Sequence, residues 1–184
     1  MFSLFKTRAE AVGSEVYRFG TKSEARKFIE EFLKKEEIKD IPGSYAVWAD
    51  CPILKDVETI KMAEKIPGLR FNVTRKLAKE AKIGITQMAW GIANTGTVVQ
   101  ESSAVEQRLA SALVWIHVAL LNTNKIVADL MALTSNMHPR ASDYIALITG
   151  PSRTADIERV LAIGVHGPER LVIVCIDEAG GITS

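Results

Sequence analysis

The sequence predicts an α/β protein in which a mostly parallel sheet is flanked by helices. Short, continuous, β-branched apolar runs alternate with segments whose apolar residues recur at helical spacing. The runs are apolar throughout, as expected when helices cover both faces of a parallel sheet. The 184 residues are 47% hydrophobic and 24% charged, which suits a globular domain that buries a core without disulfides. We therefore expect residues 1–184 to form a single domain.

The N-terminal portion, residues 1–75, is predicted to supply helix and strand elements of this domain. Residues 1–20 are expected to form a loose leading segment. Thr21 or Ser23 can cap the helix that follows, and a Pro-Gly pair separates this helix from a strand at Tyr45–Ala49. Apolar residues at helical spacing give the helix one inward face, formed by Ala25, Phe28, Ile29, Phe32 and Leu33.

The next segment is predicted to contain two short helices around a strand. Asp56 is expected to cap the first helix, and a strand is predicted at Leu69–Thr74. Thr86 is expected to cap the second helix, which continues to Ala93. The first helix is predicted to hold three apolar residues: Val57, Ile60 and Ala63.

From residue 97 onwards, strands and helices alternate regularly. The pattern predicts a strand at Thr97–Gln100, a helix at Val105–Leu113, a buried strand at Val114–Leu121 and a helix at Asn124–Met137. The first of these helices is expected to turn four residues inward: Val105, Leu109, Ala112 and Leu113.

The polar block Gly150–Glu158, of sequence GPSRTADIE, is the most distinctive stretch of the chain. It lies between two apolar runs, Tyr144–Thr149 and Leu171–Ile176, which are predicted to be buried strands. A polar, turn-forming block at the end of an apolar strand is where α/β proteins usually hold their ligand. We expect a helix to begin in the block, with Ser152 or Thr154 as its cap.

Two interpretations of this block are open. In the first, its polar residues only shape the helix: Asp156 suits the positive helix end, and Gly164 ends the helix. In the second, the helix start and Arg153 bind a phosphate or carboxylate. His166, in the tight loop 164–168, either hydrogen-bonds the local backbone or transfers a proton to a ligand. The catalytic candidates are His166, Arg153 and Asp156.

A second candidate ligand contact is the turn Thr95-Gly96-Thr97, where glycine permits close approach of the backbone and the hydroxyls can donate or accept hydrogen bonds. A simple turn that leads into a strand explains these three residues equally well. His117 lies among apolar residues, which favours a hydrogen-bonded core histidine. The full set of ligand-binding candidates is Thr95, Gly96, Thr97, Gly150, Ser152, Arg153, Thr154 and Gly167.

Charge and cysteine content narrow the classes of partner. The net charge of +1, from 23 basic and 22 acidic residues, gives no reason to expect nucleic acid or an anionic membrane as partner. Cys51 and Cys175 lie far apart and form no CxxC or Cys/His spacing, so we expect buried thiols, no metal site and no cofactor. The longest apolar run, Leu113–Leu121, is far below the roughly 20 residues of a membrane span. With no leading signal segment, a cytoplasmic protein is expected.

Four motifs together resemble the LUD domain, and within it the lactate utilisation protein C group. They are Gly84-Ile85-Thr86, Thr95-Gly96-Thr97-Val98-Val99, the block 150–158 and Gly164-Val165-His166-Gly167-Pro168. The match in order and spacing covers about residues 80–178. Asn94 departs from the family pattern, which often has an acidic residue there, and this indicates a divergent member.

The resemblance implies a fold shared with CoA transferases and ribose-5-phosphate isomerase. It also implies a bacterial role in oxidising L-lactate to pyruvate, as a cluster-free subunit beside iron–sulfur proteins. The alternative is a stand-alone enzyme or binding protein for a phosphorylated or carboxylated ligand of CoA or folate type. An assembly or regulatory module is a third reading of the same sequence. No catalytic constellation in the sequence assigns a reaction, and homo-oligomerisation is left open.

Overall fold

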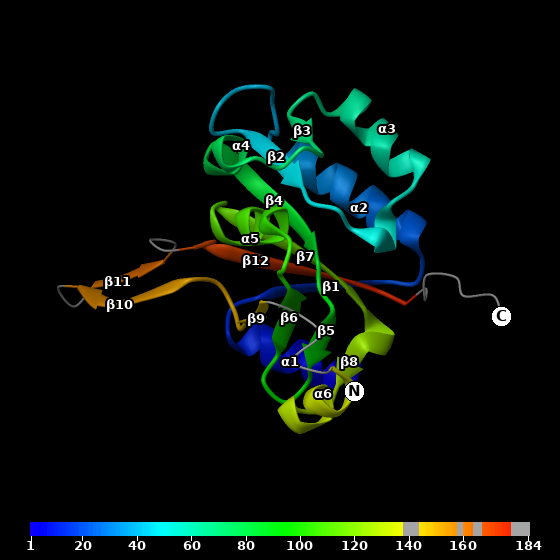
Figure 1. The fold of residues 1–184 in the computed structure, drawn as a ribbon, viewed down its shortest axis with the longest axis vertical. Coiled ribbons are helices and arrows are strands. Elements are labelled where there is room, and N and C mark those ends of the chain that lie inside the picture. Colours follow the sequence, from blue (N-terminus) through cyan, green and yellow to red (C-terminus); the bar gives the residue numbers. More distant parts are fainter. Residues whose placement is uncertain (138–143, 158–159, 164–166, 178–184) are drawn as a thin grey trace.

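The chain is built around a six-stranded sheet in which every neighbouring pair of strands is parallel (Figure 1). The computed structural model describes residues 1–137, 144–157, 160–163 and 167–177, with the backbone alone at 154–157 and 160–163. The strand order confirms the predicted α/β class. From one edge to the other the strands are β1 (Glu15–Phe19), β12 (Arg170–Ile176), β7 (Ile116–Asn122), β4 (Ala81–Gln87), β2 (Tyr45–Trp48) and β3 (Leu69–Arg70).

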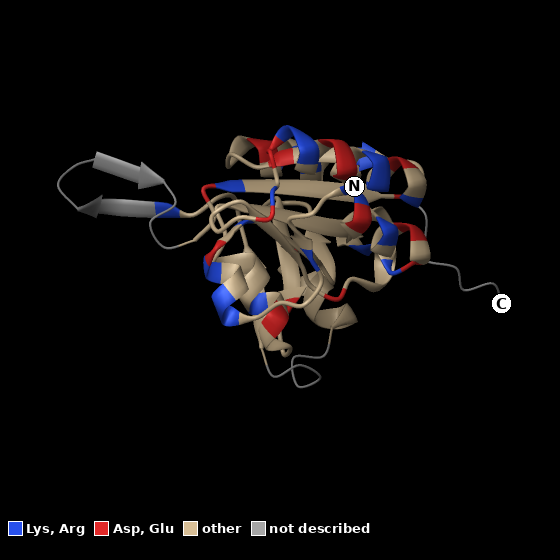
Figure 2. Cartoon of the chain, turned by 90° about the horizontal axis from the view of Figure 1, so that it is seen from above, with Lys and Arg blue, Asp and Glu red and all other residues tan. Residues whose placement is uncertain are grey.

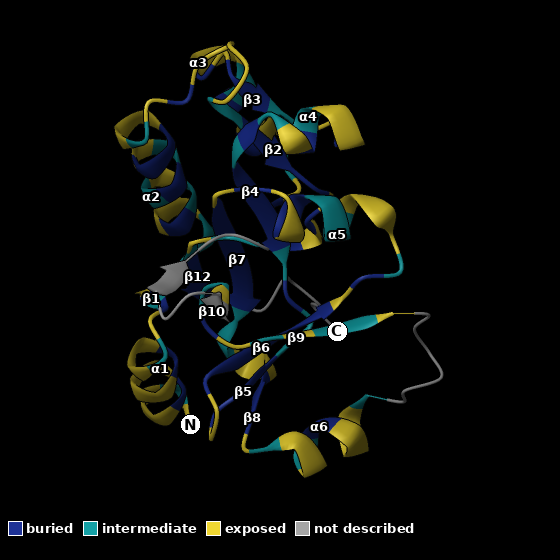
Figure 3. Cartoon of the chain, turned by 90° about the vertical axis from the view of Figure 1, so that its left-hand side faces the viewer, coloured by how far each residue is buried: buried dark blue, intermediate teal, exposed yellow. Residues whose placement is uncertain are grey.

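Helices cover both faces of this sheet, as the apolar strands predicted. One face packs against α2 and α3 and the short turn η1, and the opposite face packs against α1, α4 and α5. Figure 3 shows the buried strands between these layers and the exposed outer sides of the helices. The bounds are α1 (Phe2–Ala11), α2 (Lys22–Lys35), η1 (Pro52–Leu54), α3 (Val57–Lys65), α4 (Arg75–Lys79) and α5 (Val105–Ala112).

A smaller sheet packs beside α1 on that second face. Its order is β8-β5-β6-β9, and only the β5–β8 pair is parallel. The turn η2 and the helix α6 flank this sheet. The bounds are β5 (Trp90–Ile92), β6 (Thr97–Glu101), η2 (Thr123–Lys125), β8 (Ile126–Val127), α6 (Leu130–Asn136) and β9 (Ile145–Ile148).

Helix caps confirm two of the predicted starts. The Thr21 hydroxyl accepts a hydrogen bond from the Glu24 backbone, and the Glu24 carboxylate accepts one from the Thr21 backbone, which makes a capping box at α2. Asp56 caps α3 by accepting from the Thr59 backbone nitrogen at 2.8 Å. Basic and acidic residues are interspersed along the helices (Figure 2), consistent with the near-zero net charge.

Three element predictions are wrong because tertiary pairing overrides local pattern. Residues 1–20 are not a loose segment, since they form α1 and the edge strand β1. Residues 86–93 hold the end of β4 and all of β5 instead of a helix capped by Thr86. The segment 124–137 is not one helix, because β8 intervenes and α6 begins only after Asp129, which caps it.

The inner face predicted for α5 is wrong except at Leu109, and two of the three apolar residues predicted within α3 are exposed. In α3, Val57 and Ile60 are more than 60% exposed, whereas Met62 is buried. In α5, Val105 is half exposed, whereas Ala110 is buried. Helices of eight or nine residues present only a narrow stripe to the core, and the spacing of apolar residues did not locate that stripe.

The block after β9 forms a hairpin, so the helix predicted to start there is wrong. The strands β10 (Arg153–Ile157) and β11 (Val160–Ile163) pair antiparallel and belong to neither larger sheet. The β-branched residues in both runs favour extended backbone. The run before the block is a strand as predicted, but it lies at the edge of the smaller sheet, with Leu147 55% exposed. The run Leu171–Ile176 is a buried strand, as predicted.

Candidate functional site

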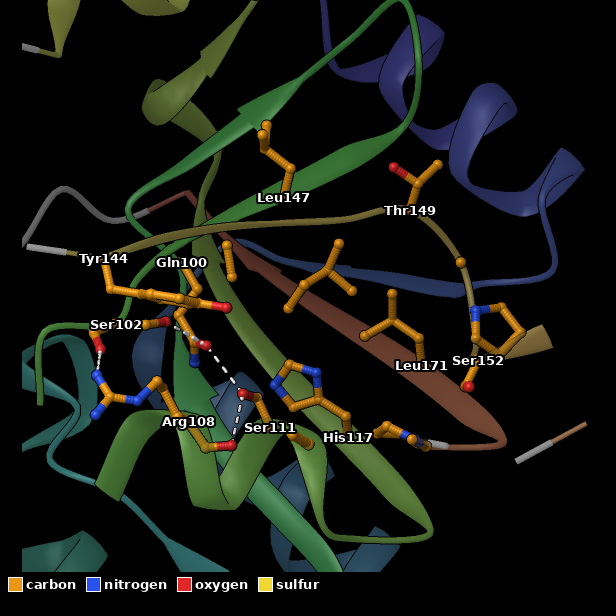
Figure 4. A pocket seen from close by; sticks show the side chains of 17 residues that line it. Gln100, Ser102, Arg108, Ser111, His117, Tyr144, Leu147, Thr149, Ser152 and Leu171 are labelled. Atoms are coloured by element: carbon orange, nitrogen blue, oxygen red, sulfur yellow. Dashed lines mark hydrogen bonds between the residues drawn. The ribbon is translucent and has the colours of Figure 1, made fainter. Parts of the chain in front are cut away.

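A cavity of about 470 Å³ lies where the smaller sheet and α5 meet the first residues of β7 and β12. This volume falls within the roughly 300–1,000 Å³ of typical small-molecule sites. Figure 4 shows Arg108 and Tyr144 toward one end of the cavity and Leu171 and Ser152 toward the other, with His117 between them. Its polar lining consists of Gln100, Ser102, Arg108, Ser111, His117, Tyr144, Thr149 and Ser152.

Strand pairing explains why these side chains share one space. His117 on β7 is paired in register with Leu171 on β12, and Gln100 on β6 with Ala146 on β9. Directly paired residues of a sheet point to the same face. Each pair therefore projects into the cavity from one wall, and α5 closes a third side with Ser111.

Gln100 organises the polar wall. Its side chain is fully buried, and its Oε1 atom accepts hydrogen bonds from the Ser102 hydroxyl at 2.8 Å and the Ser111 hydroxyl at 2.9 Å (Figure 4). Its amide nitrogen lies 3.4 Å from the Gln107 carbonyl oxygen. Both serine hydroxyls donate their protons to Gln100 Oε1. Their oxygen lone pairs therefore remain able to accept hydrogen bonds from another group. No histidine bonds the Ser102 hydroxyl in the described residues, so the geometry does not make it a nucleophile.

His117 is both a core residue and part of the cavity wall. It is 1% exposed, and its Nε2 atom forms a 2.7 Å hydrogen bond with the Thr86 hydroxyl. Burial lowers the pKa of the imidazole to about 4, so the ring is neutral at physiological pH. The described residues give its Nδ1 atom no hydrogen-bond partner. The predicted core histidine is present, but one of its two nitrogens remains available in the cavity.

Arg108 supplies the positive charge of the site. Its guanidinium donates to the backbone carbonyls of Ser102 and Ser103 and lies 5.5 Å from the ring centroid of Tyr144. No carboxylate of the described chain forms an ion pair with it. Among the described residues that line the cavity, Arg108 is the only charged side chain.

The structure places the ligand-binding candidates of the sequence in different parts of the molecule. Gly150, Ser152 and Gly167 line the cavity. Thr95 and Thr97 lie outside the lining; their hydroxyls are 2.7 Å apart, and the Thr97 hydroxyl lies 2.8 Å from that of Thr149. The side chains of Thr154 and Asp156, and the whole of His166, lie outside the described residues.

Three of the candidates seat the end of α1. Gly96 has a φ of +67°, and a Cβ added there would lie 2.5 Å from the Ala9 Cα atom. Gly150 has a φ of +72°, and an added Cβ would lie 2.5 Å from the Val12 carbonyl oxygen. The Arg153 guanidinium donates to that same oxygen at 2.6 Å. These motif residues therefore hold a helix against the sheets through close backbone approach.

Sequence reasoning missed most of the cavity wall. Gln100, Arg108 and Ser111 carry no motif, and Tyr144 was assigned only to a strand. The available signal was a polar residue at the end of each apolar run, as with Gln100 after Val99. That signal does not say which runs become neighbours in space.

The two cysteines are buried, as predicted. Burial raises the pKa of the Cys51 thiol and of the Cys175 thiol to about 12, so neither is a thiolate at neutral pH. Within the described ranges there is no group of three or more His, Cys, Asp or Glu side chains that could hold a metal ion. The same part of the chain has no helix with the length and apolar character needed to cross a membrane.

Comparison with known proteins identifies the family. The LUD domain matches residues 2–176. The chain belongs to the LUD domain family. A solved structure of a DUF162 family protein from Deinococcus radiodurans shares the fold, with a TM-score of 0.62 over 95% of each chain and 16% sequence identity.

Relatives with curated names match about half of this chain. Lactate utilization protein C from Halalkalibacterium halodurans is 34% identical over 107 residues, which is 55% of this chain and 46% of the relative. Lactate utilization protein C from Bacillus subtilis is 31% identical over 109 residues, which is 56% of this chain and 45% of the relative. YkgG from Escherichia coli K12 is 33% identical over 107 residues. The matched region spans about half the length of these relatives.

Proposed function

We propose that this LUD domain protein is a component of a cytoplasmic bacterial system that uses L-lactate by oxidising it to pyruvate. The observation that carries the proposal is the LUD domain match over residues 2–176, combined with relatives named lactate utilization protein C at 31–34% identity. The cavity adds a place for an organic ligand within the same domain.

In this proposal the electrons of lactate oxidation pass to iron–sulfur partner proteins. Iron–sulfur clusters are usually held by several cysteine thiolates brought close together. Cys51 follows β2, whereas Cys175 lies within β12, and their thiols are both protonated at neutral pH. This supports a subunit that leaves cluster binding to its partners.

Deletion of the gene in its own bacterium tests the proposed role. We expect the deletion strain to stop growing on L-lactate as sole carbon source and to grow normally on pyruvate, because only the oxidation step is lost. An intact copy of the gene should restore growth. Normal growth of the deletion strain on L-lactate would contradict the proposal.

Affinity purification tests the proposed partners separately. A tagged chain isolated from lactate-grown cells is expected to bring down proteins with the broad visible absorption of iron–sulfur clusters. An unrelated protein of similar size that carries the same tag serves as the control. Recovery of the chain without any such protein would contradict the proposed iron–sulfur partners. It would not contradict the role in lactate use, which the deletion strain tests separately.

A further inference from the structure

Part of the polar lining of the cavity is almost entirely buried. Gln100 and Ser102 are fully buried and His117 is 1% exposed, yet all three line the same open volume. Buried polar atoms in proteins nearly always have a hydrogen-bond partner. Within the described residues only the Nε2 atom of His117 forms a hydrogen bond, so its Nδ1 atom is free to bond a ligand in the cavity.

The charge of the lining selects an anion with a single negative charge. Arg108 contributes one positive charge, and no Asp or Glu is among the lining residues that the structure describes. Its contacts with the described residues are two backbone carbonyls and the ring face of Tyr144, and both hydrogen bonds come from Nη1, which leaves Nη2 and Nε for a ligand. A guanidinium that is not paired with a protein carboxylate is well suited to bind the carboxylate of a ligand.

The rest of the lining requires an apolar body. Figure 4 places Leu171 at the end of the cavity away from Arg108, and Ile148, Pro151 and Pro168 add further apolar side chains to the lining. A small ion would leave this surface in contact with water. A ligand with a hydrocarbon chain would remove it from water and gain free energy.

We propose that this cavity binds an organic monocarboxylate with an apolar chain, with the carboxylate at Arg108 and the chain against Leu171 and Pro168. A hydroxyl or oxo group beside the carboxylate would meet the open nitrogen of His117 and the serines held by Gln100. This ligand site is formed by this chain alone. It is a proposal in addition to the proposed role in lactate use and does not depend on it. It also replaces the predicted anion site at a helix start, because residues 153–157 and 160–163 are the paired strands β10 and β11.

Matched probes test each feature of the ligand by isothermal titration of the full chain. The main probe is 2-hydroxyhexanoate; its amide lacks the charge, and L-lactate lacks the apolar chain. We expect saturable binding of 2-hydroxyhexanoate, with at least about tenfold weaker binding of the amide and of L-lactate. Inorganic phosphate is expected not to bind.

Variants locate the binding. Arg108→Gln should weaken 2-hydroxyhexanoate binding about tenfold or more and leave amide binding unchanged. Arg75→Gln removes the same charge from α4, outside the cavity, and should change neither. Ala146→Leu should also weaken binding of the hydroxy acid, because Ala146 is paired with Gln100 and lines the cavity. This second variant keeps Arg108 and replaces no side chain that forms a hydrogen bond, so it tests the site even if Arg108→Gln fails to fold.

Four results would overturn the inference: no saturable binding of 2-hydroxyhexanoate, equal binding of its amide or of L-lactate, phosphate binding that depends on Arg108 without carboxylate binding, or unchanged affinity in Ala146→Leu. None of these bears on growth of the deletion strain on L-lactate, so failure of the ligand site and failure of the proposed cellular role are distinguishable.

Discussion

At the scale of single residues, His117 shows how one position serves both the core and the cavity. Its Nε2 atom is held by Thr86 on the adjacent strand, while burial keeps the ring neutral. The sequence alone could predict a buried histidine, since its neighbours are apolar. It could not predict the cavity, because the residues opposite His117 come from β6, β9 and α5, and the sequence pattern does not say how these elements pack together.

The buried imidazole makes stability depend on pH. The pKa is near 6.5 in an unfolded chain and about 4 in the folded protein, so the unfolded chain binds more protons between these values. The stabilising contribution is therefore complete above about pH 6.5 and is lost as the pH falls toward 4. We expect wild type to lose ~2 kcal/mol more unfolding free energy than His117→Gln between pH 8 and pH 5.

Urea denaturation of both proteins at the two pH values measures this difference. Carboxylates that also titrate, such as Asp56 and Glu36, are present in both proteins, so their contributions cancel in the comparison. The same loss of stability in wild type and variant would show that His117 is not the buried neutral group described here.

Among the elements, the helix α1 was not predicted from the sequence. Several motif residues contact its C-terminal end and fix it against the sheets. Gly96 and Gly150 permit its close approach, and Arg153 caps the carbonyl that follows it. The helix α1 buries only Phe5 and Ala9, so its sequence shows too few inward apolar residues to indicate a helix. The strong motif letters were visible in the sequence, but their contact with a segment about 90 to 140 residues away was not.

Gly96→Ala should be far more costly than the same change at Gly43. Both glycines have positive φ, which costs an alanine roughly 1–2 kcal/mol. At Gly43 an added Cβ meets nothing within 4 Å, whereas at Gly96 it collides with the backbone of Ala9. We expect Gly43→Ala to lose about 1 kcal/mol and Gly96→Ala roughly 2–4 kcal/mol of unfolding free energy in urea. Equal losses would show that α1 is not seated on Gly96.

Arg153 distinguishes an anchor of α1 from a ligand clamp. As an anchor, Arg153→Met should lower the unfolding free energy by about 1 kcal/mol, the typical worth of a hydrogen bond, and leave 2-hydroxyhexanoate affinity unchanged. Arg75→Met is the control for loss of an exposed arginine. Lost affinity with unchanged stability would instead make Arg153 part of the ligand site.

At the scale of the whole molecule, two sheets of different character meet, and the cavity lies at their junction. The parallel sheet and its helices could be predicted from alternating apolar runs. The smaller sheet could not, because β5, β8 and β9 are two to four residues long and pair across long stretches of chain. Arg170 further ties the parallel sheet together by ion pairs with Glu15 and Glu36, each at 2.8 Å.

The arrangement predicts that this junction, rather than the turn at Thr95–Thr97, is where a ligand binds. The Thr95 and Thr97 hydroxyls already bond one another, and Gly96 is covered by the end of α1. The Gln100 wall, by contrast, faces open space. The site is thus a property of the assembled fold and of no single motif.

The most direct test is a crystal structure of the full chain grown with 2-hydroxyhexanoate. The account predicts electron density for the ligand inside the cavity, with its carboxylate at Arg108, its hydroxyl near His117 and its chain against Leu171. Ligand density at Thr95–Thr97 or beside Arg153, with the cavity holding only water, would contradict it.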